Sequence, residues 1–193
     1  RKIKSPAEIE FIRKAAQLTD MGLEAAIKAM RPGVTEIEVW AEADYVMAKA
    51  GGDASAIPKM IGSGPKSHCL HSVASHRKLQ AGDIINMDVS GVYNRYHANA
   101  ARCFSLGEPS KAVRQWVEKT NKVYEAVTQA LTPGVPAREV LQEGQAVAEA
   151  EGIWNDVWFF GGYELGIGFP PCWVGNFTYE DRVTRPEDTF DPG

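Results

Sequence analysis

Apolar and polar positions alternate at helical spacing over the first part of the chain. The apolar face consists of Ile9, Ile12, Ala16, Leu23 and Ile27. The sequence SPAE at residues 5–8 is a capping box with proline at the first helical position, and a Pro-Gly pair at residues 32–33 ends the pattern. We therefore predict a helix that begins at Pro6 and ends before this Pro-Gly pair.

A second amphipathic stretch follows directly. Thr35 begins another capping box, TEIE, and the residues Val39, Ala43 and Val46 share one face before the chain reaches Gly51-Gly52. These signals predict a second helix that packs beside the first.

The chain matches itself at an offset of 101 residues. MRPGVTEIEV at residues 30–39 falls on LTPGVPAREV at residues 131–140, so the Pro-Gly-Val turn occurs twice. Outside that core the matched pairs are Arg13 with Arg114, Thr19 with Thr120, Glu24 with Glu125, Glu42 with Glu143, Val46 with Val147 and Gly51 with Gly152. The repeat predicts a second helix pair joined by the same turn.

Each predicted helix pair is followed by runs of β-prone residues. GDIINMDVSGVY and RYHANAARCFSLGEPS follow the first pair, and we expect a hinge at Ser90-Gly91. IWNDVWFFGGY and LGIGFPPCW follow the second pair. The order helix pair, sheet, helix pair, sheet predicts an α+β fold, with helices on one face of a largely antiparallel sheet and the other face free to line a pocket.

Composition and charge narrow the class of protein. The 193 residues are 44% hydrophobic and 24% charged, which is typical of a globular domain. The net charge is -4 and the basic residues form no tract, so we expect no nucleic-acid partner. No apolar run is long enough to span a bilayer, no apolar segment follows the basic N-terminus, and the three cysteines form no CxxC pair. We expect a cytoplasmic protein with reduced thiols and no membrane partner.

A few polar residues lie where strands are predicted. Asp88 interrupts an apolar run, and because a buried carboxylate is costly unless it is paired, it is a candidate for a site or a hydrogen-bond network. In a regular strand His97 and Asn99 share a face, which makes His97 a candidate pocket residue. Tyr163 fits either a core aromatic or a pocket donor, and Trp173, after two prolines, is placed to wall a small pocket.

Five stretches cover nearly the whole chain and carry a family likeness: KSPAEIEFIRKAA, PGVTEIEV, KLQAGDIINMDV, RYHANAARCFSLGEPS and GGYELGIGFPPCW. Together they resemble the catalytic domain of the pita-bread superfamily, which contains methionine aminopeptidase, Xaa-Pro aminopeptidase, prolidase and creatinase. The resemblance implies a pseudo-twofold α+β domain, a duplicated helix pair with an antiparallel sheet, as the internal repeat also predicts.

The resemblance further implies, for the peptidases of the family, two divalent metals held by two Asp, one His and two Glu. Carried over, the first Asp is Asp88, the second falls on Asn99 and the His falls on Tyr163, while the two Glu would follow Gly193. Asn99 supplies one neutral oxygen and no bridge, and a tyrosine is a poor substitute for imidazole. Asp88 is thus the only matching ligand position, and we expect a converted or abandoned metal site.

One branch of the superfamily works without metal. In creatinase a histidine serves as general acid and base in the cleavage of a carbon–nitrogen bond, and HSVASHRKLQAGDI aligns with the stretch that carries it, which places this role on His71. The alternative for His71 is a surface loop residue, the simpler interpretation of its neighbours His68 and His76. The glutamate of creatinase falls on Ala101, so that mechanism is not carried over whole.

We therefore predict a hydrolase that cleaves a carbon–nitrogen bond in a small substrate without metal or other cofactor. His71 is the predicted catalytic residue, and the predicted substrate-binding residues are His97, Asn99, Tyr163 and Trp173. One alternative is a metal-dependent Xaa-Pro dipeptidase or aminopeptidase that uses Mn, Co or Zn. Another is a non-catalytic binding module on the same fold.

The resemblance also sets expectations for the assembly. We expect residues 1–193 to form a catalytic-type pita-bread domain that is incomplete at its C-terminus and lacks the N-terminal domain of its relatives. Members of the superfamily usually dimerise, so we expect a homodimer. We also expect the protein to bind a small-molecule or dipeptide substrate.

Overall fold

A computed structural model describes residues 3–69, 71–157, 160–175, 178–180 and 188–191. The chain divides into two compact units, each described here by itself. The sheet unit contains residues 5–109 and 165–174, and the helix unit contains residues 1–4, 110–164 and 175–193. No helix among the described residues is both long and apolar enough to cross a membrane.

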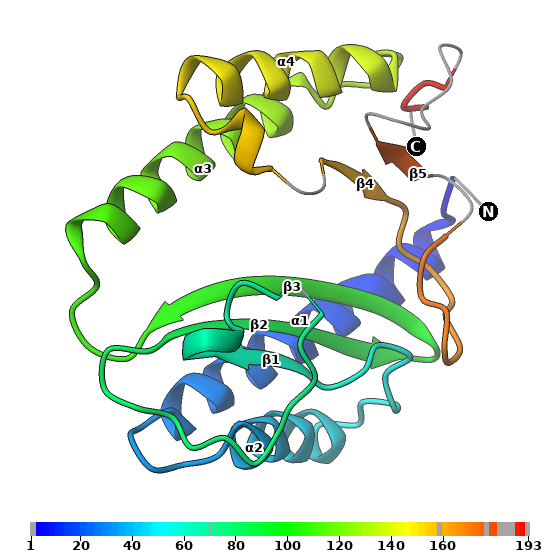
Figure 1. Cartoon of the computed structure of the whole chain (residues 1–193). Coiled ribbons are helices and arrows are strands. Elements are labelled where there is room, and N and C mark those ends of the chain that lie inside the picture. The colour runs from blue at the N-terminus through cyan, green and yellow to red at the C-terminus, as the bar shows by residue number, and fades with distance from the viewer. Residues whose placement is uncertain (1–2, 70, 158–159, 176–177, 181–187, 192–193) are drawn as a thin grey trace. The chain divides into compact units, whose positions relative to one another are not determined.

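The sheet unit begins with the two predicted helices, α1 (Pro6–Ala29) and α2 (Glu36–Lys49) (Figure 1). Both start with the predicted capping boxes: the hydroxyl of Ser5 accepts from the backbone N–H of Glu8, and the hydroxyl of Thr35 accepts from that of Glu38. In each box the glutamate accepts a hydrogen bond back from the cap residue. Local sequence therefore fixes where both helices begin.

A three-stranded antiparallel sheet follows in the order β1 (Met60–Ser63), β2 (Ile84–Tyr93), β3 (Tyr96–Ser105). The short helical turn η1 (Gly64–Lys66) comes directly after β1. The hinge predicted at Ser90-Gly91 is wrong, because β2 runs through it without a break and the chain turns only at Asn94 and Arg95, both at positive φ.

Gly91 serves close packing instead of a turn. A Cβ at this position would overlap the carbonyl oxygen of Ala15 in α1. The backbone N–H of Gly91 donates to the hydroxyl of Thr19, 2.9 Å away, and that hydroxyl also donates to the carbonyl of Ala98 in β3. The glycine therefore lets α1 lie directly against the backbone of the sheet.

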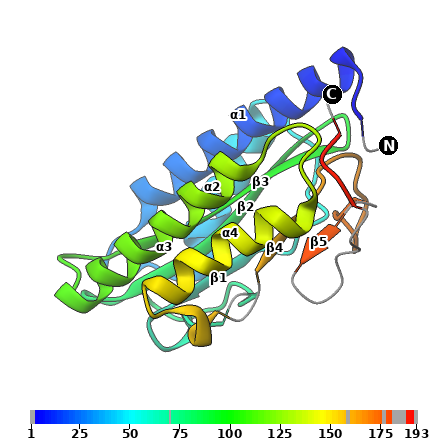
Figure 2. The same ribbon diagram turned by 90° about the horizontal axis from the view of Figure 1, so that it is seen from above.

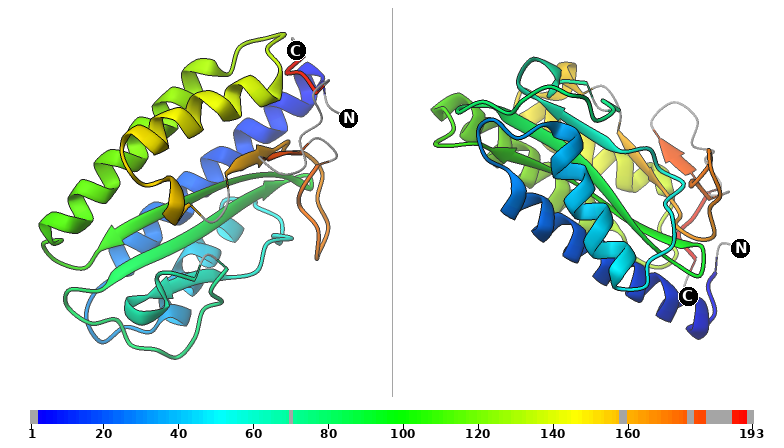
Figure 3. Two further views of the ribbon diagram at one scale, coloured as in Figure 1. Left: turned by 45° about the horizontal axis from the view of Figure 1, so that its top comes forward. Right: turned by 90° about the horizontal axis from the view of Figure 1, so that it is seen from below.

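Helices α1 and α2 cover one face of the sheet, as Figure 3 shows from two sides. Alternate residues of β2 point into this layer and are almost wholly buried: Ile85, Met87 and Val89. From the helices, Leu18, Val39 and Trp40 join the same core. Because strand side chains alternate, Asn86, Asp88 and Ser90 belong to the opposite face.

The helix unit contains the second helix pair, α3 (Lys111–Ala130) and α4 (Ala137–Ala150), which lie side by side in Figure 2. The turn η2 (Trp154–Asp156) follows, and β4 (Gly161–Tyr163) pairs with β5 (Thr178–Glu180). The predicted strand 153–163 is therefore mostly not a strand, although residues 158–159 lie outside the described part of the chain.

The predicted repeat is also present in the backbone pairing. Gly33 donates to the carbonyl of Leu79 and Leu79 donates to that of Val34, both at 2.8 Å. In the helix unit Gly134 donates to the carbonyl of Phe190 and Phe190 donates to that of Val135. Each Pro-Gly-Val turn is thus closed in the same way by a segment that returns after its helix pair.

Candidate active site

The strand pairing brings two of the predicted site residues together. Asp88 lies opposite Ala101, and Ser90 lies opposite Asn99, so Asp88 and Asn99 are diagonal neighbours on the face away from α1 and α2. The side-chain amide of Asn99 donates a hydrogen bond to the carboxylate of Asp88. The regular pairing of two long strands is sufficient to place this pair.

Asp88 is half-buried. Burial raises the pKa of its carboxyl, while the hydrogen bond from Asn99 and the attraction of His71 act in the opposite direction without cancelling it. Its Oδ1 atom is buried and has no hydrogen-bond partner among the described residues. The site therefore offers one vacant acceptor oxygen beside an amide.

His71 lies in the loop between β1 and β2 and is exposed. It is near enough to Asp88 to interact with its carboxylate electrostatically. His68 and His76, in the same loop, are also exposed. The structure thus brings His71, Asp88 and Asn99 into one cluster.

His97 is held by the backbone. Its side chain is fully buried, Nε2 accepts from the backbone N–H of Ala56 at 3.0 Å, and Nδ1 lies 2.9 Å from the carbonyl oxygen of Arg95. Because Nε2 is the acceptor, Nδ1 carries the proton and donates it. Burial lowers the pKa of His97 and favours this neutral ring. Both nitrogens are occupied by backbone partners, so the geometry gives His97 a structural role.

Trp173 is half-buried and ends a hairpin that folds onto the β2–β3 turn. In this hairpin Gly168 donates to the carbonyl of Arg95, and a Cβ on Gly168 would meet both the His97 ring and the Cα of Trp173. Tyr163 is half-buried in β4 of the helix unit, where it pairs with Thr178. Trp173 and His97 are thus brought together near one turn.

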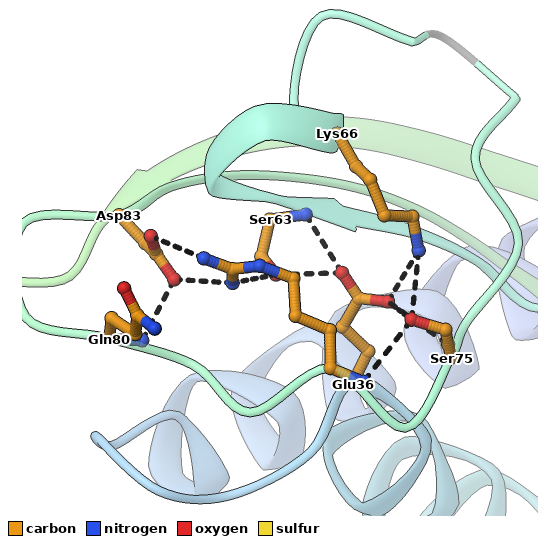
Figure 4. Close-up of polar contacts among 7 residues, drawn as sticks. Glu36, Ser63, Lys66, Ser75, Gln80 and Asp83 are labelled. Atoms are coloured by element: carbon orange, nitrogen blue, oxygen red, sulfur yellow. Dashed lines mark hydrogen bonds and ion pairs between the residues drawn. The ribbon is translucent and has the colours of Figure 1, made fainter.

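A buried ionic network beneath the His71 loop was not predicted (Figure 4). Glu36, at the start of α2, is fully buried, and its carboxylate accepts from Ser63, Lys66 and Ser75. Burial alone would raise the pKa of Glu36, but these hydrogen bonds outweigh it and the pKa is lowered. In the sequence Glu36 looks like any acidic residue in a first helical turn, so no local signal distinguishes it.

The network continues to Asp83. Arg77 donates to both carboxylate oxygens of Asp83, at 2.6 and 3.0 Å, and also to the hydroxyl of Ser63. The hydrogen bond from Arg77 holds the pKa of Asp83 below its usual value. Both ends of the loop are therefore linked to one charged cluster.

The side chains of His71, Asp88 and Asn99 do not fit as ligands for a pair of divalent cations. Within the described ranges, no group of three or more His, Cys, Asp or Glu side chains is arranged to hold a metal ion. Asp88 is the one carboxylate of the cluster, and its neighbour Asn99 is neutral and bonded to it, whereas a two-metal pair needs bridging carboxylates to offset the repulsion between the ions.

Comparison with known proteins gives the family. The profile of metallopeptidase family M24 matches residues 10–191. The chain belongs to this family. An Xaa-Pro dipeptidase from Pyrococcus furiosus is 33% identical over 140 residues, which are 72% of this chain and 40% of that protein. The M24 chain thus spans about two fifths of the length of that relative.

Solved structures agree on the M24 fold. The prolidase from Pyrococcus furiosus superposes with a TM-score of 0.80 at 29% identity, over 86% of this chain and 49% of that one. The X-Pro aminopeptidase from Thermotoga maritima gives a TM-score of 0.85 at 25% identity, over 96% and 52%. The α+β pita-bread fold predicted from the sequence is confirmed, on the creatinase and prolidase side of the family.

Proposed function

We propose that this M24 protein is a hydrolase that cleaves a carbon–nitrogen bond in a small substrate without metal, with His71 as the proton shuttle. The observation that carries the proposal is the cluster on the sheet: Asn99 donates to Asp88, and His71 interacts electrostatically with the same carboxylate. The family resemblance puts a neutral amide, Asn99, at the position of a metal-ligand acid, and the imidazole of His71 acts on the carboxylate to which that amide bonds.

Each group of the cluster has a role in this reaction. His71 takes a proton from water while the water oxygen bonds to the substrate carbon, and it returns the proton to the nitrogen as the carbon–nitrogen bond breaks. Asp88 stabilises the positive charge that the imidazole carries between these two transfers. The vacant Oδ1 of Asp88 accepts an N–H of the substrate. In the sheet unit Asn99 and Trp173 remain our proposed substrate-binding residues, and in the helix unit Tyr163 remains one.

The second candidate is a metal-dependent Xaa-Pro dipeptidase, because that is the name of the relative from Pyrococcus furiosus. Elemental analysis separates the two. The protein is purified without chelator and analysed again after incubation with manganese or zinc. We expect far less than one metal per chain, whereas near-stoichiometric metal would overturn the metal-free reaction and favour the dipeptidase.

A matched pair of variants tests the role of His71 itself. His71→Ala removes the imidazole, and His76→Ala removes another exposed histidine from the same loop. Against small amide and guanidino substrates we expect kcat to fall by about 10²–10⁴-fold in His71→Ala and to stay near the wild-type value in His76→Ala. Equal rates in the two variants would overturn the role of His71, and a wild type that turns over none of these substrates would favour a binding module.

A further inference from the structure

Glu36 is a fully buried carboxylate whose hydrogen bonds all go to one loop. Oε1 accepts from the backbone N–H and the hydroxyl of Ser63, at 3.0 and 2.7 Å. Oε2 accepts from the backbone N–H and the hydroxyl of Ser75, at 3.0 and 2.6 Å, and from Lys66 at 2.6 Å. A single side chain thus ties the start and the end of the loop to helix α2 (Figure 4).

The internal repeat shows that helix α2 does not itself require this acid. Ala137 is the repeat counterpart of Glu36, at the start of α4, and it is equally buried. Its backbone N–H donates to the carbonyl of Asp188, as that of Glu36 donates to the carbonyl of Arg77. The helix start and its pairing with the returning segment therefore form with or without a buried charge. Because burying a charge is costly, its presence at residue 36 calls for a local cause.

The cause lies in what the loop carries. His71 sits between the two tied ends, and it must stay beside Asp88 on the sheet for the two to interact. Within the described part of the chain, the exposed side chain of His71 makes no hydrogen bond, so the loop backbone determines where it lies. Residue 70, its neighbour, is outside the described part of the chain.

We propose that Glu36 is a positioning residue that fixes the loop from Ser63 to Ser75 and thereby holds His71 beside Asp88. The role of His71 rests on the proposed function, but the fixing of the loop does not. The two parts are therefore tested separately.

Amide hydrogen exchange tests the fixing of the loop. Glu36→Gln keeps the volume but replaces one acceptor oxygen by an NH2 group, which cannot accept from Ser63 or Ser75 at that end. We expect the amide of the serine that faces the NH2 group to exchange faster by on the order of tenfold or more. The control is Glu38→Gln, in the same helical turn. Among the described residues, the carboxylate of Glu38 accepts hydrogen bonds only from Thr35.

Unchanged exchange at both serines in Glu36→Gln, or equal acceleration in Glu38→Gln, would overturn the proposal. If Glu36→Gln does not fold, Ser75→Ala is the second variant, because it removes one hydroxyl donor and leaves the carboxylate in place. It should accelerate exchange at residue 75 and leave Ser63 unchanged. If the amide of residue 75 exchanges at the same rate in Ser75→Ala as in the wild type, the role of Glu36 is again contradicted.

Kinetics test whether Glu36 acts through His71. On a small amide or guanidino substrate, we expect Glu36→Gln to lower kcat at least tenfold with KM little changed, and to have no further effect in a His71→Ala background. Equal losses in both backgrounds would show a general structural effect and overturn the positioning role. If the wild type hydrolyses none of these substrates, the proposed function fails, and the exchange experiment still decides whether Glu36 fixes the loop.

Discussion

Two histidines of this protein differ in what surrounds the ring. The ring of His97 is buried and both of its nitrogens bond to backbone groups, whereas His71 is exposed and interacts with a single carboxylate. Since both nitrogens of His97 are occupied by backbone groups, its ring has no nitrogen left to exchange a proton with a substrate. Strand alternation predicts that His97 and Asn99 lie on one face of their strand. It could not show that the His97 ring accepts a hydrogen bond from the backbone N–H of Ala56.

The buried state of His97 predicts a pH dependence of stability. Since burial lowers its pKa in the folded protein, the unfolded chain binds the proton more readily, and stability is lost as pH falls below about 6.5. His97→Leu removes this dependence and also leaves the N–H of Ala56 without its acceptor, at a cost of about 1–3 kcal/mol at pH 8.

Chemical denaturation of wild type and His97→Leu between pH 8 and pH 5 measures both effects. The control is His76→Leu, at an exposed loop position, which should follow the wild-type curve. A variant at residue 97 with the same pH slope as the wild type would show that this ring is not held neutral.

At the scale of elements, one buried hydroxyl of helix α1 bonds to the backbone of two strands of the sheet. Thr19 accepts from the N–H of Gly91 in β2 and donates to the carbonyl of Ala98 in β3. Its repeat counterpart Thr120 is exposed and donates only to carbonyls of its own helix. Both hydroxyls lie within hydrogen-bond distance of the carbonyl four residues earlier in their own helix, and of the two only that of Thr19 also bonds to the sheet.

Thr19→Val keeps the shape but removes the acceptor of the buried N–H of Gly91 and one of the donors to the carbonyl of Ala98. We expect it to lower the free energy of unfolding by about 1–3 kcal/mol, and Thr120→Val to change it by less than about 0.5 kcal/mol. Urea denaturation of both variants at pH 7 measures the difference. Similar losses in the two would mean that the link between α1 and the sheet contributes little.

At the scale of the whole molecule, acid should unfold the protein partly through the network beneath the His71 loop. The pKa values of Glu36 and Asp83 are lowered in the folded state, so the stability that they contribute is present above their ordinary values near 4 and is lost as pH falls through the folded ones. This loss begins below the range in which His97 acts.

Asp83→Asn tests this second acid step. It removes the ionic partner of Arg77, and we expect it to lower stability at pH 7 by about 2–3 kcal/mol and to flatten the decline between pH 5 and pH 3. Thermal unfolding at several pH values measures both. If the stability of Asp83→Asn declines between pH 5 and pH 3 as steeply as that of the wild type, other carboxylates cause the acid unfolding.

The sequence allowed much of the fold to be predicted, because caps, helical periodicity and an internal repeat are local signals. The family resemblance put Asp88 and Asn99 in one site, but the register that makes them diagonal neighbours was not predicted. The Glu36 network could not be predicted, since it joins residues distant in the chain through side chains that look ordinary in place. The hinge assigned to Gly91 was wrong because a glycine also serves close packing, which only the position of α1 reveals.

The closure of both Pro-Gly-Val turns by backbone groups alone has a consequence for which of their positions constrain the residue type. The returning residues Leu79 and Phe190 contribute their backbone N–H and carbonyl groups, so these hydrogen bonds do not depend on which side chain is present, although Leu79 also packs in the core. Gly33 and Gly134 both adopt positive φ, near +90°, where other residues are strained. The turn itself therefore constrains residue type at the two glycines and not at the residues that close it, so a substitution of either glycine should strain its turn whatever side chain faces it.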